Sequence, residues 1–432
     1  MTFLVPFASL AILQGNAPLS LDDAVSIAVQ NAFSIRQQKA VIEKNRQKIR
    51  ENEGQLGPRV SISGTYTRYD QESTTSFGNT TIVTQPIDAK NVAASLQLPI
   101  DISGNVGRIV QASKASLVAS EETLNATRND VKLNVRRSYL NILRAEDQVA
   151  VARLAVQEAE ERLKNAKLEL EQGTKAKIDV IRIEAQVAQA QSDLLTVQNQ
   201  VNLSKQVLNN ALGRPIETEF QTVHVDNLPE MPMVDPSTID VAAQKVRPEV
   251  KALEKTQLAL AYIRRATERG QNPSLNLAIN YLRNIDAKGF SARDESTTGT
   301  LTLNFPIFDS GVTRAQVKQA RQDEESAKIQ LDQVRLGISL EVRQAMTNMS
   351  NSMARLDVAK RQLASAEENY RIAKVRLAEG AGITIEITDA LTQLTQARNS
   401  LVSARYDYWT AFSELQRAVG SDELQQVIGG KN

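Results

Sequence analysis

The stretch LPIDISG at residues 98–104 and the stretch FPIFDSG at residues 305–311 occupy equivalent places in two copies of one longer pattern. At a single offset of 207 residues, Pro99 matches Pro306 and Gly104 matches Gly311. Because Pro and Gly mark turns and element ends, copies that share them share an architecture as well as a composition. The same offset relates Arg136 to Arg343, Gly173 to Gly380 and Gly213 to Gly420.

A very long helix is expected after the glycine of each copy. From about Ile102 to Gln172 the first copy has no Pro, and after Gly107 it has no Gly. This predicts one helix of ~70 residues, about 105 Å long. Large and small residues recur at heptad spacing, so two helices can approach closely and supercoil left-handed. The large positions are Val135, Ile142, Val149, Val156, Leu163 and Leu170, and the small ones are Ser138, Ala145, Ala152, Ala159 and Ala166.

Each long helix ends at a glycine that predicts a sharp turn. Gly173 and Gly380 stand where a C-cap glycine is expected. Returning helices are predicted from about Asp179 to Leu212 and from about Glu386 to Val419. Each copy therefore predicts an antiparallel coiled-coil hairpin with its tip at the glycine.

Four segments alternate apolar and polar side chains with the period of a β-strand. One face of each segment is apolar and the other is polar but uncharged. This pattern is typical both of strands in a membrane barrel and of a half-buried soluble sheet. The segments are residues 60–66, 92–98, 275–281 and 301–307.

The number of strands favours a barrel made by several chains. Two hairpins cannot close a barrel, and an isolated hairpin is marginally stable in water. The chain also has no apolar helix suited to cover a four-stranded sheet. Three chains with four strands each would close a 12-stranded barrel with no free edge, which predicts a homotrimer.

The repeats and their boundaries predict five regions along the chain. The loops between paired strands, 69–90 and 284–297, are polar, and Pro58 to Pro99 is eight residues longer than Pro273 to Pro306. The predicted regions are a signal peptide at 1–18, a first repeat at 19–213, a Pro-rich linker at 214–238, a second repeat at 239–420 and a tail at 421–432. The first repeat would contain a β-hairpin at about 59–100 and a coiled-coil hairpin at 102–213. The second would contain a β-hairpin at about 274–307 and a coiled-coil hairpin at 309–420.

Composition excludes several classes of function. The net charge is +1, so no global basic field favours nucleic acid. Cysteine is absent, which removes disulfides, thiolate metal sites and cysteine nucleophiles. The single histidine, His224, lies in the Pro-rich linker and is expected to be an exposed loop residue rather than a ligand. With no nucleotide-binding glycine loop and no Gly-x-Ser-x-Gly elbow, the chain is not expected to be an enzyme or to hold a cofactor or metal.

The N-terminus has some features of a secretory signal. Phe3 to Leu13 is an apolar run of about the length of a signal-peptide core, followed by the small residues Gly15 and Ala17. No Lys or Arg precedes the run, and Pro18 follows the expected cleavage point. We expect a signal peptide that is truncated or misassigned at its start; the alternative is a disordered apolar N-terminus. The sequence contains no run of about 18 apolar residues, so no transmembrane helix is predicted.

The order of motifs from Leu19 to Gly420 resembles the outer membrane factor family, the TolC-like outer membrane efflux proteins. Single motifs are weak, but their order and spacing over two copies are specific. The matching stretches are Leu19-Ser-Leu-Asp-Asp-Ala24, Arg247-Pro248-Glu249-Val250, Leu98-Pro99-Ile100, Phe305-Pro306-Ile307-Phe308-Asp309-Ser310-Gly311, the hairpin tips and Ala418-Val419-Gly420.

The resemblance implies a fold, a location and partners. The fold would be mostly α with a small β part: a trimeric α/β-barrel duct with a 12-stranded barrel in outer membrane lipid and a helical tunnel in the periplasm. The chain would be the exit duct of a tripartite efflux pump or a type I secretion system. Its partners would be a periplasmic adaptor (membrane fusion) protein and an inner-membrane transporter of RND, MFS or ABC type.

The hairpin tips are where functional side chains are expected. Glu386 and Asp389 are three residues apart and share a helix face, so a trimer would hold them as two stacked rings of carboxylates that favour cations. The resemblance implies that they form the periplasmic constriction, with Asp179 as an acidic partner on the first hairpin. The turns at Gly173, Gly380 and Gly382 would contact the adaptor. The alternative is that the three acids are only favourable charges at helix N-termini.

The sequence departs from the family at one part of the gate. The family's best-studied gate ties neighbouring helices with a basic and an aromatic residue near the second tip. Gly382 and Leu377 stand at those positions, so that polar latch would be absent or rebuilt. A different class of protein, a coiled-coil envelope spacer or adhesin-like stalk, would explain the heptads but not the strands or the duplication.

Overall fold

The structure is a computed structural model that describes residues 18–225, 227–230, 236–285 and 293–421. Residues 1–17 of the predicted signal peptide and residues 422–432 of the predicted tail lie outside these residues. The chain divides into two compact units. Unit 1 comprises residues 1–39, 123–250 and 334–432, and unit 2 comprises residues 40–122 and 251–333.

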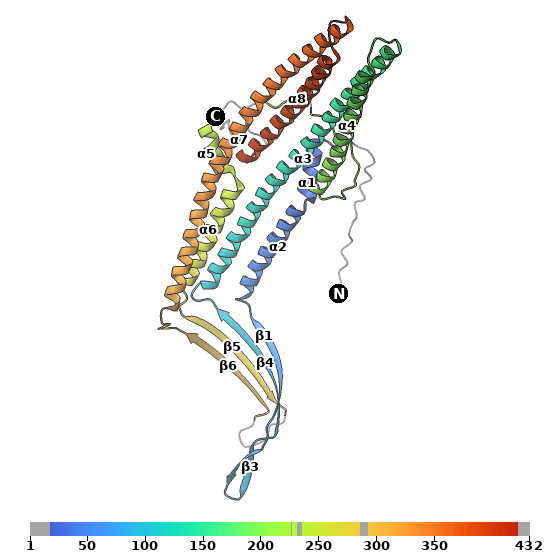
Figure 1. Ribbon diagram of the computed structural model, residues 1–432. Helices are drawn as coiled ribbons and strands as arrows, with labels where there is room; N and C mark the ends of the chain where they lie inside the picture. Colours follow the sequence, from blue (N-terminus) through green and yellow to red (C-terminus); the bar gives the residue numbers. More distant parts are fainter. Residues whose placement is uncertain (1–17, 226, 231–235, 286–292, 422–432) are drawn as a thin grey trace. The chain divides into compact units, whose positions relative to one another are not determined.

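Eight helices lie in the described part of the chain, and two of them are very long (Figure 1). Helices α3 and α7 each have 67 residues and contribute to both units. The bounds are α1 Leu21–Asn31, α2 Phe33–Gly54, α3 Asn105–Glu171, α4 Lys177–Ala211, α5 Pro236–Val246, α6 Pro248–Thr267, α7 Val312–Ala378 and α8 Thr384–Val419. No helix among the described residues is both long enough and apolar enough to cross a membrane.

Unit 2 contains a four-stranded antiparallel sheet with the strand order β1-β4-β5-β6. Its strands are β1 Arg59–Arg68, β4 Asp88–Ile100, β5 Ser274–Asn284 and β6 Glu295–Asn304. The contact between β4 and β5 joins the two sequence repeats. The register aligns Leu98, Leu277 and Leu301 across three strands, so their side chains form an apolar row on one face.

A second hairpin lies in the segment 69–90, where the sequence predicted a polar loop. Strands β2 Ser73–Phe77 and β3 Thr80–Gln85 pair with each other in a separate two-stranded sheet. Phe77 pairs with Thr80, and Gly78 has a φ of +62°. A Gly-Asn pair between two strand-forming segments is a known signal for a two-residue hairpin turn. This hairpin lies within the longer loop of the first repeat.

The aspartates of the repeated stretches begin the long helices. The Asp101 carboxylate accepts hydrogen bonds from the Asn105 and Gly107 amides, at 2.8 and 3.0 Å. The Asp309 carboxylate accepts from the Gly311 and Thr313 amides, at 3.0 and 2.8 Å. Because the first amides of a helix have no partner within it, each carboxylate satisfies donors that would otherwise be unpaired.

The heptad positions pack between the paired helices of unit 1. Ala166 of α3 contacts Val180 and Ile183 of α4, with Leu163 and Leu170 beside them. The equivalent cluster of the second hairpin brings Ala373 of α7 against α8. Alanine on one side of each seam lets the two backbones approach, as the heptad pattern predicted. In that second cluster the α8 residues are Ile387 and Ala390, and Tyr370 and Leu377 pack at its edge.

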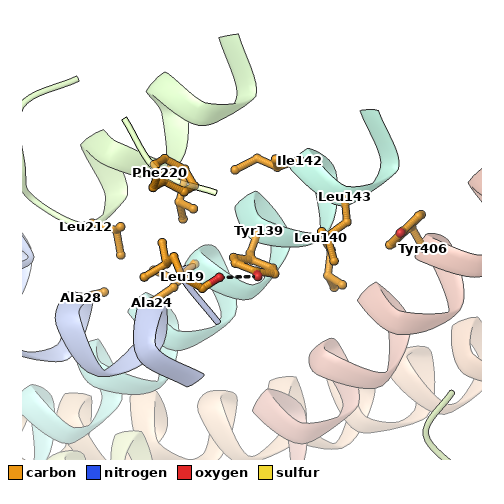
Figure 2. Packing of buried hydrophobic residues seen from close by; sticks show 12 residues of the cluster. Leu19, Ala24, Ala28, Tyr139, Leu140, Ile142, Leu143, Leu212, Phe220 and Tyr406 are labelled. Atoms are coloured by element: carbon orange, nitrogen blue, oxygen red, sulfur yellow. Dashed lines mark hydrogen bonds between the residues drawn. The ribbon is translucent and has the colours of Figure 1, made fainter. Parts of the chain in front are cut away.

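The largest apolar cluster of unit 1 gathers several elements around Tyr139 of α3 (Figure 2). The Tyr139 side chain is fully buried, and its hydroxyl lies 2.7 Å from the Leu19 carbonyl oxygen and 2.8 Å from the Val223 carbonyl oxygen. The same hydroxyl accepts the Val223 amide at 2.8 Å. Leu19 precedes α1 and Val223 follows α4, so one phenol joins three parts of the chain.

Candidate functional site

Both hairpin tips have the same backbone geometry. Gly173 and Gly380 have φ values of +74° and +72°. The residue after each glycine donates its amide five residues back, Thr174 to the Glu169 carbonyl and Ala381 to the Arg376 carbonyl. This is the Schellman arrangement, in which the residue after the helix takes the left-handed conformation. The structure therefore places the predicted turns at Gly173 and Gly380.

Gly382 has a different role from the other two tip glycines. A Cβ atom at this position would lie 3.0 Å from the Leu377 backbone nitrogen and 3.1 Å from the Arg376 carbonyl carbon. The chain thus crosses close to the end of α7. Gly382 is required by this close approach, whereas Gly380 is required by its backbone angle.

The three predicted acids lie at the starts of the returning helices. Asp179 is half-buried in the first turn of α4, 3.8 Å from the Arg182 guanidinium. Glu386 is in the first turn of α8, and Asp389 is exposed one turn later. Neither helix has a side-chain cap, since the cap positions are Ala176 and Ile383. The negative charges lie where the helix dipole favours them.

A basic residue at the second tip was not identified from the sequence. Arg376 lies 3.7 Å from the Glu386 carboxylate and donates to the Ala381 carbonyl at 3.3 Å. Both charged side chains are about half exposed, so the pair contributes little stability. Its effect is geometric, because it holds the tip loop against the start of α8. Helical ion pairs are three or four residues apart, and Arg376 and Glu386 lie on different helices. The turn between α7 and α8 brings them together.

A second polar contact links the two hairpins one turn deeper. Arg162 of α3 donates to the Thr388 hydroxyl of α8 at 2.8 Å and to Gln186 of α4 at 3.5 Å. Burial lowers the pKa of the Arg162 guanidinium. Arg398 of α8 pairs with Glu158 of α3 at 3.5 Å. The Thr388 contact lies beside Glu386 and Asp389, and the Arg398 pair connects the same two helices more than two turns farther along α8.

The contacts continue along α3 and α8 as a row of polar pairs, here called the α3–α8 row. Arg144 contacts Asp407 at 2.6 Å, and the Tyr406 hydroxyl donates to Asp147 at 2.8 Å. Burial and then the Asp147 hydrogen bond raise the pKa of Tyr406. Further pairs in the row are Arg136 with Gln416 at 2.9 Å and Arg137 with Glu414 at 2.5 Å.

His224 does not have the surroundings of a metal ligand. Its side chain is about half exposed, and its Nδ1 lies 3.8 Å from Asp147. Within the part of the chain that the structure describes, no group of three or more His, Cys, Asp or Glu residues could hold a metal ion.

The fold matches solved outer-membrane channels over nearly the whole chain. The CusC structure matches with a TM-score of 0.79 and 18% identity, covering 95% of this chain and 96% of that chain. The Campylobacter jejuni CmeC outer membrane channel also has a TM-score of 0.79 at 18% identity, covering 93% of this chain and 85% of that chain. Four antiparallel strands joined to two long helical hairpins therefore define an outer-membrane channel fold.

Sequence comparisons give the family. The model of the outer membrane efflux protein family matches residues 24–214 and 241–421, and the chain belongs to that family. Outer membrane protein TolC of Escherichia coli is 23% identical over 402 residues, covering 89% of this chain and 79% of TolC. The cobalt-zinc-cadmium resistance protein CzcC of Cupriavidus metallidurans is 23% identical, covering 76% of each chain. The protein is thus an outer membrane exit duct, and its family is one of transport channels.

Proposed function

We propose that three copies of this chain form one duct, which receives cargo from an inner-membrane transporter through a periplasmic adaptor. The observation that carries this proposal is the four-stranded sheet. Strands β1 and β6 each have one partner within the described residues, so both edges of the sheet are open. Open edges with exposed apolar residues need pairing. A barrel of three such sheets pairs every edge with a neighbouring chain.

Glu386 and Asp389 would narrow the periplasmic end of this duct, with Asp179 beside them. Two observations support the assignment. The acids lie next to the two tips, and the tips lie at the same end of unit 1 (Figure 1). Arg376 and the Arg162–Thr388 contact fix the backbone that carries them. Rings of carboxylates at a narrow opening attract cations and repel anions.

The tips would also be the contact with the adaptor. Around each tip, the start of the returning helix exposes apolar side chains that are more than half accessible among the described residues. Ile178 is 55% exposed in the first tip, and Ile383 and Ile385 are 61% and 57% exposed in the second. Clustered exposed apolar residues are typical of protein contacts. The turns at Gly173, Gly380 and Gly382 would set the shape of this surface.

Single-channel conductance in lipid bilayers tests the constriction. The double variant Glu386→Gln, Asp389→Asn removes both charges without changing side-chain size. We expect lower cation selectivity and weaker block by multivalent cations. The matched control is Glu368→Gln, which removes an exposed carboxylate from α7 farther from the tip. Unchanged selectivity and block in the double variant would refute the constriction.

Extraction tests the duct against the coiled-coil spacer or stalk. We expect the full chain to need detergent for extraction and to run as a heat-resistant trimer. A soluble elongated dimer would instead support the spacer, because a spacer has no membrane strands to shield. Removal of residues 59–100 takes away two strands of the four-stranded sheet. If the duct is correct, the shortened chain should no longer insert into the membrane and should not need detergent for extraction.

A further inference from the structure

The β2–β3 hairpin extends the β1–β4 pair past the end of the four-stranded sheet (Figure 1). The Tyr69 amide donates to the Ile87 carbonyl at 2.7 Å, and Ser73 then pairs with Gln85. Because α2 leads into β1 and α3 follows β4, the helices join these strands at their other ends. The hairpin therefore lies at the end of the sheet away from the helices, which is the outer mouth of the proposed duct.

The hairpin carries no charge. From Ser73 to Ile87 the sequence contains no Asp, Glu, Lys or Arg, whereas the corresponding loop of the second repeat includes Asp294 and Glu295. Natural proteins usually protect an exposed strand edge with charged side chains, above all Lys. Strands β2 and β3 form a two-stranded sheet with no third strand among the described residues, so both of its edges are open and unprotected.

The two faces of the hairpin differ in their apolar side chains. The Phe77–Thr80 and Thr75–Ile82 pairs lie on one face, and Val83 lies on the other. Phe77 is 70% exposed. A two-stranded hairpin is marginally stable in water unless its apolar side chains pack against something. The face with Phe77 and Ile82 is therefore the one that benefits most from a partner.

The size of the proposed barrel brings the hairpins of three chains within reach of one another. Twelve strands that are about 4.8 Å apart and tilted by about 40° close into a barrel with a radius of about 12 Å. Equivalent positions of the three chains are then about 21 Å apart. The stretch from Tyr69 to Gly78 spans about 30 Å as an extended strand. Each hairpin is thus long enough to reach the three-fold axis.

We infer that the three β2–β3 hairpins of one trimer pack against one another through the face that carries Thr75, Phe77 and Ile82. We call this set of three hairpins the crown. The inference rests on the proposed function, because only the barrel brings the hairpins together. The barrel holds them at an effective concentration of the order of millimolar, so weak contacts are enough. The absence of charge fits this partner, since identical charged segments would repel each other at short distance.

The chain has no cysteine, so one introduced cysteine reports on the crown directly. Phe77→Cys places a thiol on the inferred contact face of each hairpin. Mild oxidation of the purified trimer should link neighbouring chains, and a denaturing gel without reductant measures the linked dimer. A three-fold set of single cysteines forms only one disulfide, so about two-thirds of the chains should become dimer at completion. The yield should not change on dilution, because the reaction takes place within one trimer.

Asp294→Cys is the matched control. Asp294 is exposed just before β6, and its carbonyl accepts the Asn284 amide at 2.8 Å, which keeps this position at the barrel wall. Its equivalents in the trimer would be about 21 Å apart, far beyond the Cβ separation of about 4 Å that a disulfide requires. This thiol should react with a maleimide as readily as that of Phe77→Cys but should form no linked dimer.

A charge variant tests the contact face. In the Phe77→Cys chain, Thr75→Glu places three carboxylates on the packed face and should slow oxidation about three- to tenfold. Thr74→Glu places the same charge on the opposite face and should have a smaller effect. Equal dimer yields for Phe77→Cys and Asp294→Cys in a stable trimer would overturn the crown alone. Absence of a trimer in the parent chain would overturn the proposed function, and the crown with it.

Discussion

At single positions, the hairpin tips show that identical residues can be required for different reasons. Gly380 has a φ of +72°, and nothing lies within 4 Å of the site of a Cβ atom. An alanine there would fit in space but would be strained in its backbone. Gly382 has the opposite problem, because a Cβ atom would meet backbone atoms of α7. A flexible side chain could move away from the added Cβ atom, but the backbone at the end of α7 cannot.

The first prediction concerns Gly380→Ala, which should destabilise the second tip by about 1–2 kcal/mol. Thermal unfolding of the purified protein and hydrogen exchange at the tip amides measure the effect. The control is Gly337→Ala in α7, which has open space and an ordinary helical backbone. It should stabilise the helix by about 0.5–1 kcal/mol. Equal effects of the two substitutions would contradict the backbone argument.

At the scale of one element, the start of α7 depends on a carboxylate. Hydrogen bonds from the side chain and backbone amide of Thr313, followed by those from Gln271 and Gly311, lower the pKa of Asp309 to about 2. A lowered pKa means that the folded state favours the charged form. The contribution of Asp309 to stability is therefore complete above its unfolded pKa of about 4 and is lost as the pH falls through about 2.

The second prediction follows from this pH window. Protection of the α7 N-terminal amides should fall between about pH 4 and pH 2, after correction for intrinsic exchange rates. In Asp309→Asn the side chain no longer titrates, so the protection should be lower and independent of pH in this range. A decrease of the same size in the variant would show that another group is responsible.

Local signals in the sequence identify elements better than they identify contacts between elements. The heptad seam and the glycines at 173 and 380 are local patterns, and they predicted the hairpins. The Gly78-Asn79 turn between β2 and β3 is likewise a local signal. The contacts of Arg162 with Thr388 and of Arg376 with Glu386 have no such signal. They depend on how helices pair and on how a turn folds back.

At the scale of the whole molecule, the repeats are equivalent in architecture but not in detail. Both copies supply two strands of the sheet and one helical hairpin. Only the first copy has the extra β2–β3 hairpin, and only the first copy is followed by a segment whose backbone contacts α4, α3 and α8, at Thr218, Val223 and Val225. A duct built from six similar hairpins would thus have alternating tips. The acids Glu386 and Asp389 lie on one type, and Asp179 lies on the other.

The last prediction tests which face of the sheet contacts lipid. Leu301 is 64% exposed and aligns with Leu277 and Leu98, whereas Thr302 faces the opposite side. If the apolar row contacts lipid, Leu301→Arg should cost about 2–4 kcal/mol near the bilayer midplane. Thr302→Arg would place the same charge in the water-filled interior and should be tolerated. The yield of heat-resistant trimer measures both, and equal yields would contradict this orientation because a charge in hydrocarbon has no compensating partner.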